Sequence, residues 1–392
     1  MNDFDVFPDR FAEKCRKWDK KIIEQQYGEV IDDYIPMWIA DMDFRAPQEL
    51  LDKLHQAVDI GVFGYTYVYD DFYEAVMNYF KRHHNTSPKR EWLTLCYGTV
   101  STLHYTVQAF CKKDDYVMLS TPVYQPFERA AKAHGVKVIE NELIVKNNRY
   151  YIDFNKMEEQ LKRYRPKLYM LCNPHNPSGR IWSREELNTL LSLCQKYETI
   201  VISDEVHSGL IFDGTYTSSI ETGALFHNVI LLSSPNKQYN LGGLKTSYAI
   251  IENDDLRKTF RDRLTKNSIT SPTVFGIIAL VACYNEGEEY TQELKDYLKK
   301  NYRCACRYID THIPQLSYME MESSYLLWVN IKSTKMDSDT FTHRLAKEKG
   351  VLVESGNEFI GNGEGYIRIN LGTQLKNIEE AFKRIGEFVS ED

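Results

Sequence analysis

Short polar segments stand where predicted strands end, and their side chains could share one site. These segments are residues 98–101 (Gly-Thr-Val-Ser), Tyr124, residues 173–179 (Asn-Pro-His-Asn-Pro-Ser-Gly), residues 203–205 (Ser-Asp-Glu) and residues 233–237 (Ser-Ser-Pro-Asn-Lys). The carboxyl ends of parallel strands meet at one edge of a sheet, and ligands of such sheets bind there. We therefore expect one pocket lined by all of these segments.

Lys237 carries the most reactive chemistry in this set. It follows Ser234 by three residues and precedes a glycine-rich stretch that ends at Lys245. A lysine amine can join an aldehyde as a Schiff base, and neighbouring hydroxyl and backbone donors can bind a phosphate. The pattern predicts a site for pyridoxal 5'-phosphate attached to Lys237. Taken alone, this residue would be interpreted as a solvated surface lysine.

The other segments supply what the ring and the phosphate of that cofactor need. A buried Asp204 carboxylate would keep the ring nitrogen protonated, because unit charges about 4 Å apart at an effective dielectric constant near 20 attract by roughly 4 kcal/mol. Alone, Asp204 could equally be a helix N-cap. Asn176 can donate its amide to the phenolic oxygen, and Tyr124 can stack on the ring. The predicted phosphate ligands are Gly98, Thr99 and Val100 at a helix N-terminus, with Ser234 and Lys245.

The elements that must position these residues alternate between strand and helix. Apolar runs of strand length lie at 116–119, 167–172, 199–203, 229–233 and 247–251. Between two of them, Ser183-Arg-Glu-Glu has the spacing of a capping box and opens a predicted helix. The apolar face of that helix carries Leu187, Leu190, Leu191 and Cys194. This order predicts an α/β fold in which helices flank a mostly parallel sheet.

The pattern changes after Tyr284. A charged helix is predicted over 289–310, followed by strands near 325–331 and 365–370 with a helix between them. This order predicts a smaller α+β domain. We place a large cofactor-binding domain at residues 48–285, the small domain at 286–392, and an N-terminal segment, 1–47, that joins the small domain.

Composition argues against several classes of protein. With 48 Lys and Arg against 56 Asp and Glu, the net charge is −8, which does not favour nucleic acid as a partner. The longest apolar run, 274–284, is shorter than the roughly 20 residues of a membrane-spanning helix, so we expect a core helix and no membrane partner. The 8 cysteines lack CxxC spacing, and no metal site is predicted. An acidic start without a secretory signal predicts a cytoplasmic protein.

Several motifs occur in the order that a known family has. They are Asn-Pro-x-Asn-Pro-x-Gly at 173–179, Ser-Asp-Glu at 203–205, Ser-x-x-Lys at 234–237 and Tyr-Ile-Arg-Ile-Asn at 366–370. The set resembles the fold-type I pyridoxal-phosphate enzymes, the aspartate aminotransferase superfamily. The stretches that resemble its MalY/PatB branch, the cystathionine β-lyases or C–S lyases, are residues 38–44, 63–65, 173–180 and 203–207. The resemblance implies that the large sheet has seven strands.

The resemblance implies roles for individual residues at the cofactor. Lys237 would form the Schiff base and act as the catalytic amine. Asp204 would contact the pyridine nitrogen, Asn176 the phenolic oxygen and Tyr124 the face of the ring. His207 is expected beneath the ring, as a packing side chain or, alternatively, as a catalytic one.

Other roles concern the substrate and a second subunit. Arg368 would bind the substrate α-carboxylate, a task suited to a planar bidentate donor, with Ala40 and Asn176 also facing the substrate. Tyr65 would cross a subunit interface to the phosphate of the neighbouring site, which implies a homodimer with active sites at the interface.

The expected activity is therefore that of a pyridoxal-phosphate-dependent C–S β-lyase. It would act on cystathionine or related S-substituted cysteines and release a thiol, homocysteine in the case of cystathionine, with pyruvate and ammonia. An aminotransferase of class I/II would share every cofactor contact and remains an alternative, as does a fold retained mainly for a regulatory binding role. A dinucleotide or P-loop enzyme is not favoured, because neither GxGxxG nor GxxxxGK[ST] is present.

Overall fold

The larger of the two main sheets has seven strands in the computed structural model, which describes residues 2–212 and 214–391. In spatial order the strands are β2 (Leu93–Cys96), β11 (Ser247–Ile250), β10 (Val229–Ser233), β9 (Ile200–Asp204), β8 (Leu168–Cys172), β3 (Tyr116–Thr121) and β5 (Lys137–Glu142). The pairs from β10 to β5 are parallel, whereas β11 runs antiparallel to both of its neighbours. The predicted mostly parallel, seven-stranded sheet is confirmed.

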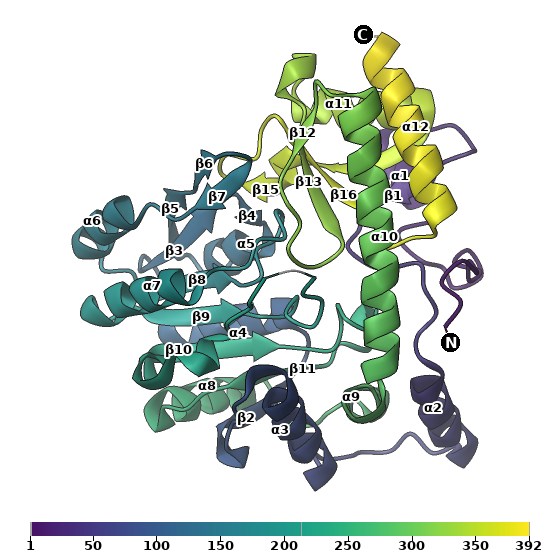
Figure 1. The fold of residues 1–392 in the computed structure, drawn as a ribbon. Coiled ribbons are helices and arrows are strands. Elements are labelled where there is room, and N and C mark those ends of the chain that lie inside the picture. The colour runs from purple at the N-terminus through teal and green to yellow at the C-terminus, as the bar shows by residue number, and fades with distance from the viewer. Residues whose placement is uncertain (1, 213, 392) are drawn as a thin grey trace.

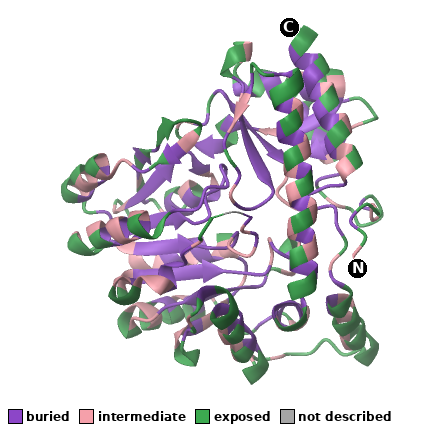
Figure 2. Ribbon diagram, viewed as in Figure 1, coloured by how far each residue is buried: buried purple, intermediate pink, exposed green. Residues whose placement is uncertain are grey.

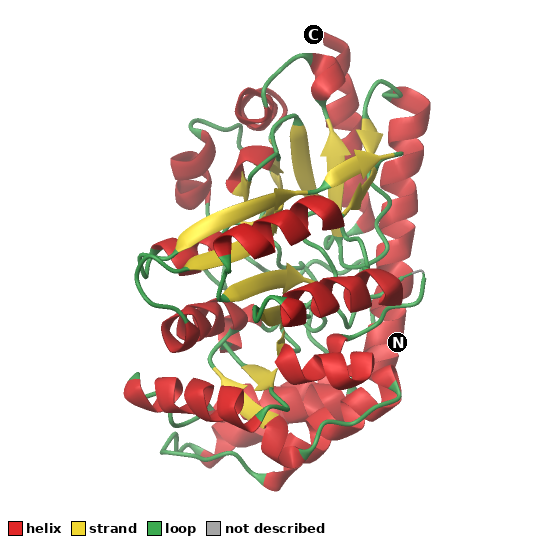
Figure 3. Ribbon diagram, turned by 90° about the vertical axis from the view of Figure 1, so that its left-hand side faces the viewer, coloured by secondary structure: helices red, strands yellow, loops and turns green. Residues whose placement is uncertain are grey.

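Helices cover both faces of this sheet, as Figure 3 shows. Successive side chains of a strand point to opposite faces, so Leu168 and Met170 of β8 join one apolar cluster while Tyr169 and Leu171 join the other. The first cluster contains side chains of α4 (Thr99–Phe110), α5 (Pro126–Lys132) and α8 (Asp254–Lys266). The second contains side chains of α3 (Asp70–His84), α6 (Phe154–Tyr164), α7 (Arg184–Lys196) and α9 (Val274–Glu286).

Two helices predicted from the sequence form as expected. Ser183 caps α7: its hydroxyl accepts from the backbone N–H of Glu186, and the Glu186 carboxylate accepts from the backbone N–H of Ser183. The apolar run at 274–284 lies in α9, and most of its side chains are buried. The central strands of both main sheets are buried, whereas the edge strands β5 and β12 are partly exposed, as are the outer faces of the helices (Figure 2).

A second sheet has five strands and lies beside the first (Figure 1). In spatial order they are β1 (Ile35–Met37), β14 (Val351–Ser355), β16 (Tyr366–Asn370), β13 (Leu326–Asn330) and β12 (Ser317–Tyr318). β1 pairs in parallel with β14, while the other pairs are antiparallel. The N-terminal part of the chain therefore belongs to the same sheet as its last strands.

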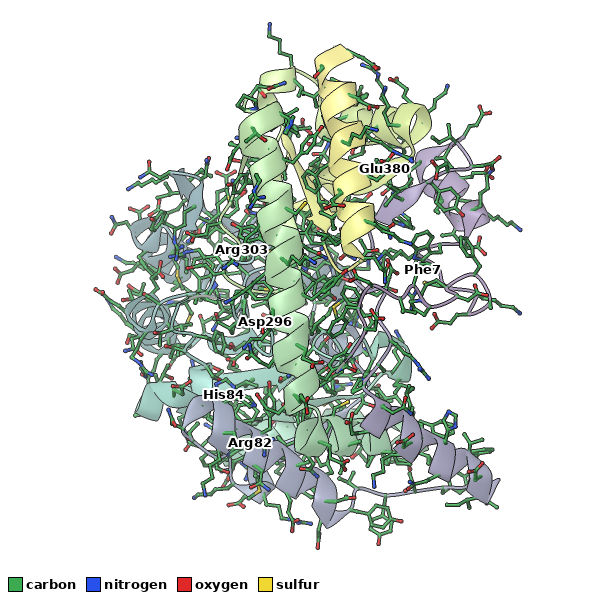
Figure 4. All side chains as sticks on the ribbon, turned by 45° about the vertical axis from the view of Figure 1, so that its right-hand side comes forward. Phe7, Arg82, His84, Asp296, Arg303 and Glu380 are labelled. Atoms are coloured by element: carbon green, nitrogen blue, oxygen red, sulfur yellow. The ribbon has the colours of Figure 1, made fainter. Side chains whose placement is uncertain are left out.

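The helices of this second half are α10 (Glu288–His312), α11 (Ser338–Lys349) and α12 (Leu375–Glu391). α10 runs from α9 to the second sheet, and exposed Asp296 and Arg303 lie along it in Figure 4. The remaining elements are α1 (Lys20–Tyr27), α2 (Gln48–Ile60) and two pairs of short strands, β4 (Val123–Tyr124) with β15 (Phe359–Ile360) and β6 (Ile144–Lys146) with β7 (Arg149–Tyr151). Among the described helices, none combines the length and apolar character needed to cross a bilayer.

Candidate active site

A cavity of about 240 Å³ lies at the edge of the large sheet where its parallel strands end. Tyr124 follows β3, Asn176 follows β8, Asp204 ends β9 and Lys237 follows β10. Lys245 precedes β11, and because that strand is antiparallel its beginning lies at the same edge. The predicted residues that line the cavity are Ala40, Gly98, Thr99, Val100, Tyr124, Asn176, Asp204, His207, Ser234, Lys237 and Lys245.

Lys237 is held in the wall of this cavity. Its amine donates to the backbone carbonyl of Ala40 at 2.8 Å, and the same oxygen accepts from the hydroxyl of Tyr325 at 3.0 Å. Burial, together with the nearby positive charge of Arg368, lowers the pKa of the amine to about 8. The position excludes the alternative of a solvated surface lysine, and the lowered pKa makes the neutral amine more accessible than it is in an exposed lysine.

Asp204 is buried and faces the cavity. The backbone N–H of Val206 donates to Oδ1 at 3.2 Å. Burial raises the pKa of this carboxyl to about 7, a change that the Lys237 charge opposes. A cation next to the carboxylate would favour its charged form, so the site is suited to a ligand that presents a protonated nitrogen.

Asn176 and Arg368 form a hydrogen-bonded pair beside the cavity. Arg368 Nη1 donates to Asn176 Oδ1 at 3.0 Å, which leaves the amide nitrogen of Asn176 available as a donor. Arg368 is almost fully buried, and its Nη2 donates to the carbonyl of Trp38 at 3.1 Å. Its Nε is a buried donor without a partner among the described residues. An incoming carboxylate could satisfy that donor.

A helix N-terminus forms one end of the cavity. α4 begins directly after Gly98, whose φ of 76° and ψ of 147° are accessible to glycine and strained for other residues. The first backbone N–H groups of α4 have no intrahelical acceptors, so this end of the helix is suited to an anion. Ser234 and Lys245 line the same cavity and add a hydroxyl and an amine.

His207 and Tyr124 supply two rings to the cavity wall. His207 Nδ1 lies 2.9 Å from the hydroxyl of Ser324. Burial and the positive charges of Lys237 and Arg368 hold the pKa of His207 well below its usual value, so the imidazole is neutral. A neutral, buried imidazole fits the predicted packing role better than the alternative of a proton-transfer role.

Tyr65 lies apart from the residues described above. Its side chain is fully exposed, on the loop that follows α2, and it does not line the cavity. The predicted contact with a second subunit therefore stays a prediction. The described residues contain no cluster of three or more His, Cys, Asp or Glu side chains suited to a metal ion.

Sequence reasoning missed several of the residues that hold one wall of the site, namely Asn370, Asn240, Tyr325, Gln374 and Lys17. This wall includes residues 38–43 (Trp-Ile-Ala-Asp-Met-Asp), called the 38–43 segment below, in which no helix or strand forms. Each of its carbonyl groups accepts from at least one side chain of another segment. The carbonyl of Trp38 accepts from Arg368, that of Ile39 from Asn370, and that of Ala40 from both Lys237 and Tyr325. The carbonyl of Asp41 accepts from Asn370 and Lys17, that of Met42 from Asn240, and that of Asp43 from Gln374.

Two of these hydrogen-bond donors, Asn370 and Asn240, could have been identified from their positions in the sequence. Asn370 follows Arg368 by two residues in a predicted strand, so its side chain points to the same face as the arginine. Asn240 stands in the stretch that follows Lys237. Tyr325 and Gln374 had no comparable signal, because their role depends on contacts between segments that lie far apart in the chain.

Comparison with known proteins agrees with the motifs. Residues 39–385 match the family model described as aminotransferase class I and II. The chain is 34% identical over 385 residues to cystathionine β-lyase PatB of Bacillus subtilis (strain 168), with 98% of each chain covered. It is also similar to two solved structures. Cystalysin from Treponema denticola, which contains a pyridoxal 5'-phosphate cofactor, has a TM-score of 0.95 at 29% identity, with 100% of this chain and 99% of the other covered.

The second solved structure is the pyridoxal-phosphate-bound C–S lyase of Staphylococcus hominis. It has a TM-score of 0.92 at 28% identity, with 99% of this chain and 98% of the other covered. These findings confirm the resemblance to the fold-type I enzymes and to their MalY/PatB branch.

Proposed function

Because the chain belongs to the aminotransferase class I and II family, we propose that it is a pyridoxal-phosphate-dependent C–S β-lyase. Its substrates are cystathionine or related S-substituted cysteines, and its products are a thiol, pyruvate and ammonia. The observation that carries this proposal is the Lys237 amine, whose pKa is lowered to about 8 in a cavity that also presents Asp204 and a helix N-terminus. The likeness to PatB and to C–S lyases supports the choice of reaction.

The residues around the cavity fit this cofactor. Asp204 is a buried carboxylate that accepts from Val206 and can accept from a pyridine N–H as well. Asn176 has an amide nitrogen available for the phenolic oxygen, because its oxygen already accepts from Arg368. The phosphate would lie at the N-terminus of α4, with Ser234 and Lys245, and Tyr124 would lie against the ring.

The chemistry of the reaction is divided between the cofactor and the chain. When bound, pyridoxal phosphate supplies an electron-poor ring that stabilises negative charge at the α-carbon of an amino acid. Asp204 would hold the proton on the ring nitrogen. Lys237, once free, accepts the α-proton as a general base, and an amine with a pKa of about 8 is well matched to that task. Loss of the Cβ thiolate then follows, and water converts the remaining fragment to pyruvate and ammonia.

Arg368 and the 38–43 segment orient the substrate. Arg368 binds the α-carboxylate through charge-assisted hydrogen bonds, for which its unpartnered Nε is available. Ala40 belongs to the same wall as Arg368, and its carbonyl accepts a hydrogen bond from the Lys237 amine. In this arrangement the carboxylate would bind at Arg368, and the Lys237 amine would remain available for the α-proton.

Release of pyruvate tests the proposal directly. The purified chain, saturated with cofactor, is expected to form pyruvate and thiol from cystathionine or S-alkyl cysteines without added keto acid. Bound cofactor is expected to absorb visible light and to be fixed to Lys237 by borohydride, as peptide mass spectrometry would show. If no thioether amino acid gives pyruvate while the cofactor is bound at Lys237, the lyase assignment is wrong.

Transamination is the second candidate, and the match to an aminotransferase family model favours it as an alternative. Both reactions would begin with removal of the α-proton by Lys237. The lyase would then expel the Cβ thiolate, whereas transamination would keep the C–S bond and transfer the amino group to a keto acid. Turnover that requires an added keto acid, with amino groups transferred to it and no thiol released, would establish transamination instead.

The proposal includes a two-fold homodimer. Exposed apolar side chains crowd α2 and the loop after it: Val58, Ile60, Val62, Phe63, Tyr65, Tyr67 and Tyr69. An apolar patch of this kind marks an interface between proteins. Tyr65 in this patch would reach the phosphate of the neighbouring subunit. Light scattering of the cofactor-saturated protein is expected to give the mass of two chains.

We also propose the limits of the two domains and a cytoplasmic location for the protein. The large domain spans 48–285, and the small domain spans 286–392 together with the N-terminal segment 1–47. The pairing of β1 with β14 supports the place given to that segment. All 8 cysteines are free thiols, which suits a cytoplasmic protein. Limited proteolysis of the holoenzyme is expected to cut near residue 286 before it cuts within either domain.

A further inference from the structure

Arg368 already faces a carboxylate of its own chain. Glu354 on β14 is the register partner of Arg368 on β16, directly across the antiparallel pair. Glu354 Oε2 and Arg368 Nη2 form an ion pair between these neighbours. The side chain of Glu354 is 23% exposed, and that of Arg368 is 2% exposed. The Oε2 atom of Glu354 is itself buried, so the contact lies inside the protein although part of the Glu354 side chain is exposed.

The donors of Arg368 are unequally occupied. Nη1 is used by Asn176, and Nη2 is shared between the carbonyl of Trp38 and Glu354. Nε has no partner among the described residues. A substrate carboxylate that binds in bidentate fashion needs a second donor besides Nε, and that donor is in contact with Glu354. Two carboxylates at one guanidinium repel each other, more strongly in a partly buried site than in water.

Glu354 also balances charge in the absence of substrate. A buried guanidinium without a counter-ion is costly, and a carboxylate placed directly across the sheet lowers that cost. Burial and the neighbouring Glu358 raise the pKa of Glu354, whereas Arg368 and Lys237 oppose that rise. Glu354 is not the only group that orients Arg368, because Nη1 donates to Asn176 and Nη2 donates to the carbonyl of Trp38.

We propose that Glu354 competes with the substrate α-carboxylate for Arg368 and so weakens substrate binding. The inference rests on the proposed function, in which Arg368 binds the α-carboxylate of an amino acid. Glu354 acts through Arg368 and takes no part in the chemistry. Since Asn176 and Trp38 still orient the guanidinium, loss of the Glu354 charge is expected to strengthen carboxylate binding and not to disorder the site.

The test uses a carboxylate that cannot react. Calorimetric titration of the cofactor-saturated protein with propionate is expected to give a Kd about tenfold lower for Glu354→Gln than for the unsubstituted protein. Glu358→Gln is the matched control, because Glu358 is exposed, lies close to Glu354 and does not contact Arg368. Its Kd is expected to stay within twofold, and Arg368→Gln is expected to abolish propionate binding.

Several outcomes would overturn the proposal. They are an unchanged or higher Kd in Glu354→Gln, an equal decrease in Glu358→Gln, and no propionate binding at all. If Glu354→Gln does not fold, Glu354→Asp keeps the charge but shortens the reach. The expected decrease in its Kd is then about threefold, and no decrease contradicts the competition.

Steady-state kinetics separate competition from a structural role. With an S-alkyl cysteine, Glu354→Gln is expected to lower KM about tenfold and to change kcat less than twofold. A fall in kcat together with a higher KM would instead assign Glu354 to holding Arg368 in place. If the unsubstituted protein forms no pyruvate, the proposed function fails, but the propionate titrations still decide the role of Glu354.

Discussion

The two walls of the cavity are built in different ways. The cofactor wall, which consists of Gly98, Asn176, Asp204 and Lys237, comes from turns that follow parallel strands of the large sheet. Each of those turns is a short continuous motif. The second wall, called the substrate wall after the role proposed for it, consists of the 38–43 segment, whose Ala40 and Asp41 line the cavity, and of Arg368 beside it. It is assembled by hydrogen bonds between segments that lie far apart in the chain.

This difference suggests a division of work. In the proposed function, groups of the cofactor wall act on the reacting atoms, so their loss should lower kcat. Groups of the substrate wall are proposed to place the amino acid, so their loss should act mainly on KM. Substitutions in the two walls test that division.

Replacement of Lys237 by alanine is expected to reduce kcat for pyruvate formation about 10⁴-fold, near the upper end of what a general base contributes. The control is Lys258→Ala, since Lys258 is exposed on α8 and remote from the cavity. Continuous assay of pyruvate with both variants measures the difference. If Lys237→Ala retained more than a tenth of the activity, the Lys237 amine would not be the general base.

Replacement of Asp204 by asparagine is expected to lower kcat on the order of a thousandfold, because an attraction of roughly 4 kcal/mol with the ring nitrogen is lost. KM should change much less. Stopped-flow and steady-state assays with saturating cofactor measure both constants. A rise in KM without a fall in kcat would contradict the assignment of Asp204 to the cofactor wall.

Although Asp204→Asn is expected to lower kcat, it is expected to increase the stability of the protein without cofactor. The Asp204 carboxyl has its pKa raised from 3.8 to about 7, so between these values the folded state retains a proton that the unfolded state releases. The free energy of unfolding therefore falls as pH rises from about 4 to about 7, since each tenfold difference in proton affinity between the two states is worth about 1.4 kcal/mol. Urea unfolding is expected to show Asp204→Asn more stable than the unsubstituted protein at pH 8, with a smaller gain at pH 5.

Replacement of Arg368 by glutamine tests the substrate wall. Loss of charge-assisted hydrogen bonds worth about 1.5–3 kcal/mol is expected to raise KM roughly ten- to a hundredfold. Arg303→Gln serves as the control, because Arg303 is exposed on α10 (Figure 4). An unchanged KM in Arg368→Gln would place the carboxylate elsewhere in the cavity.

Replacement of Tyr325 by phenylalanine should have the smallest effect of the four. It removes one hydrogen bond of about 1 kcal/mol to the carbonyl of Ala40, which still accepts from Lys237. We expect kcat/KM to fall about fivefold. The control is Tyr318→Phe, on β12 of the same sheet. The Tyr318 hydroxyl donates a hydrogen bond to Asp310, so this substitution also removes one hydrogen bond, but not one to Ala40. Equal losses in the two variants would argue against a role for Tyr325 in the substrate wall.

The cofactor wall was predictable from the sequence and most of the substrate wall was not. Lys237, Asp204 and Asn176 stand directly after apolar runs of strand length, and parallel strands bring such positions together. Glu354 could not be paired with Arg368 without the register of β14 against β16. Arg368 itself was assigned by resemblance, since a lone arginine in a predicted strand carries no local signal.

The pairing of β1 with β14 affects how the protein is made. Ile35 to Met37 leave the ribosome long before their partners Val351 to Val353, which lie far downstream in the chain. The large sheet can assemble on a nascent chain, whereas the 38–43 segment must wait for strands at the other end of the chain. A prematurely terminated chain could therefore possess most of its cofactor-binding turns and still be unable to hold an amino acid.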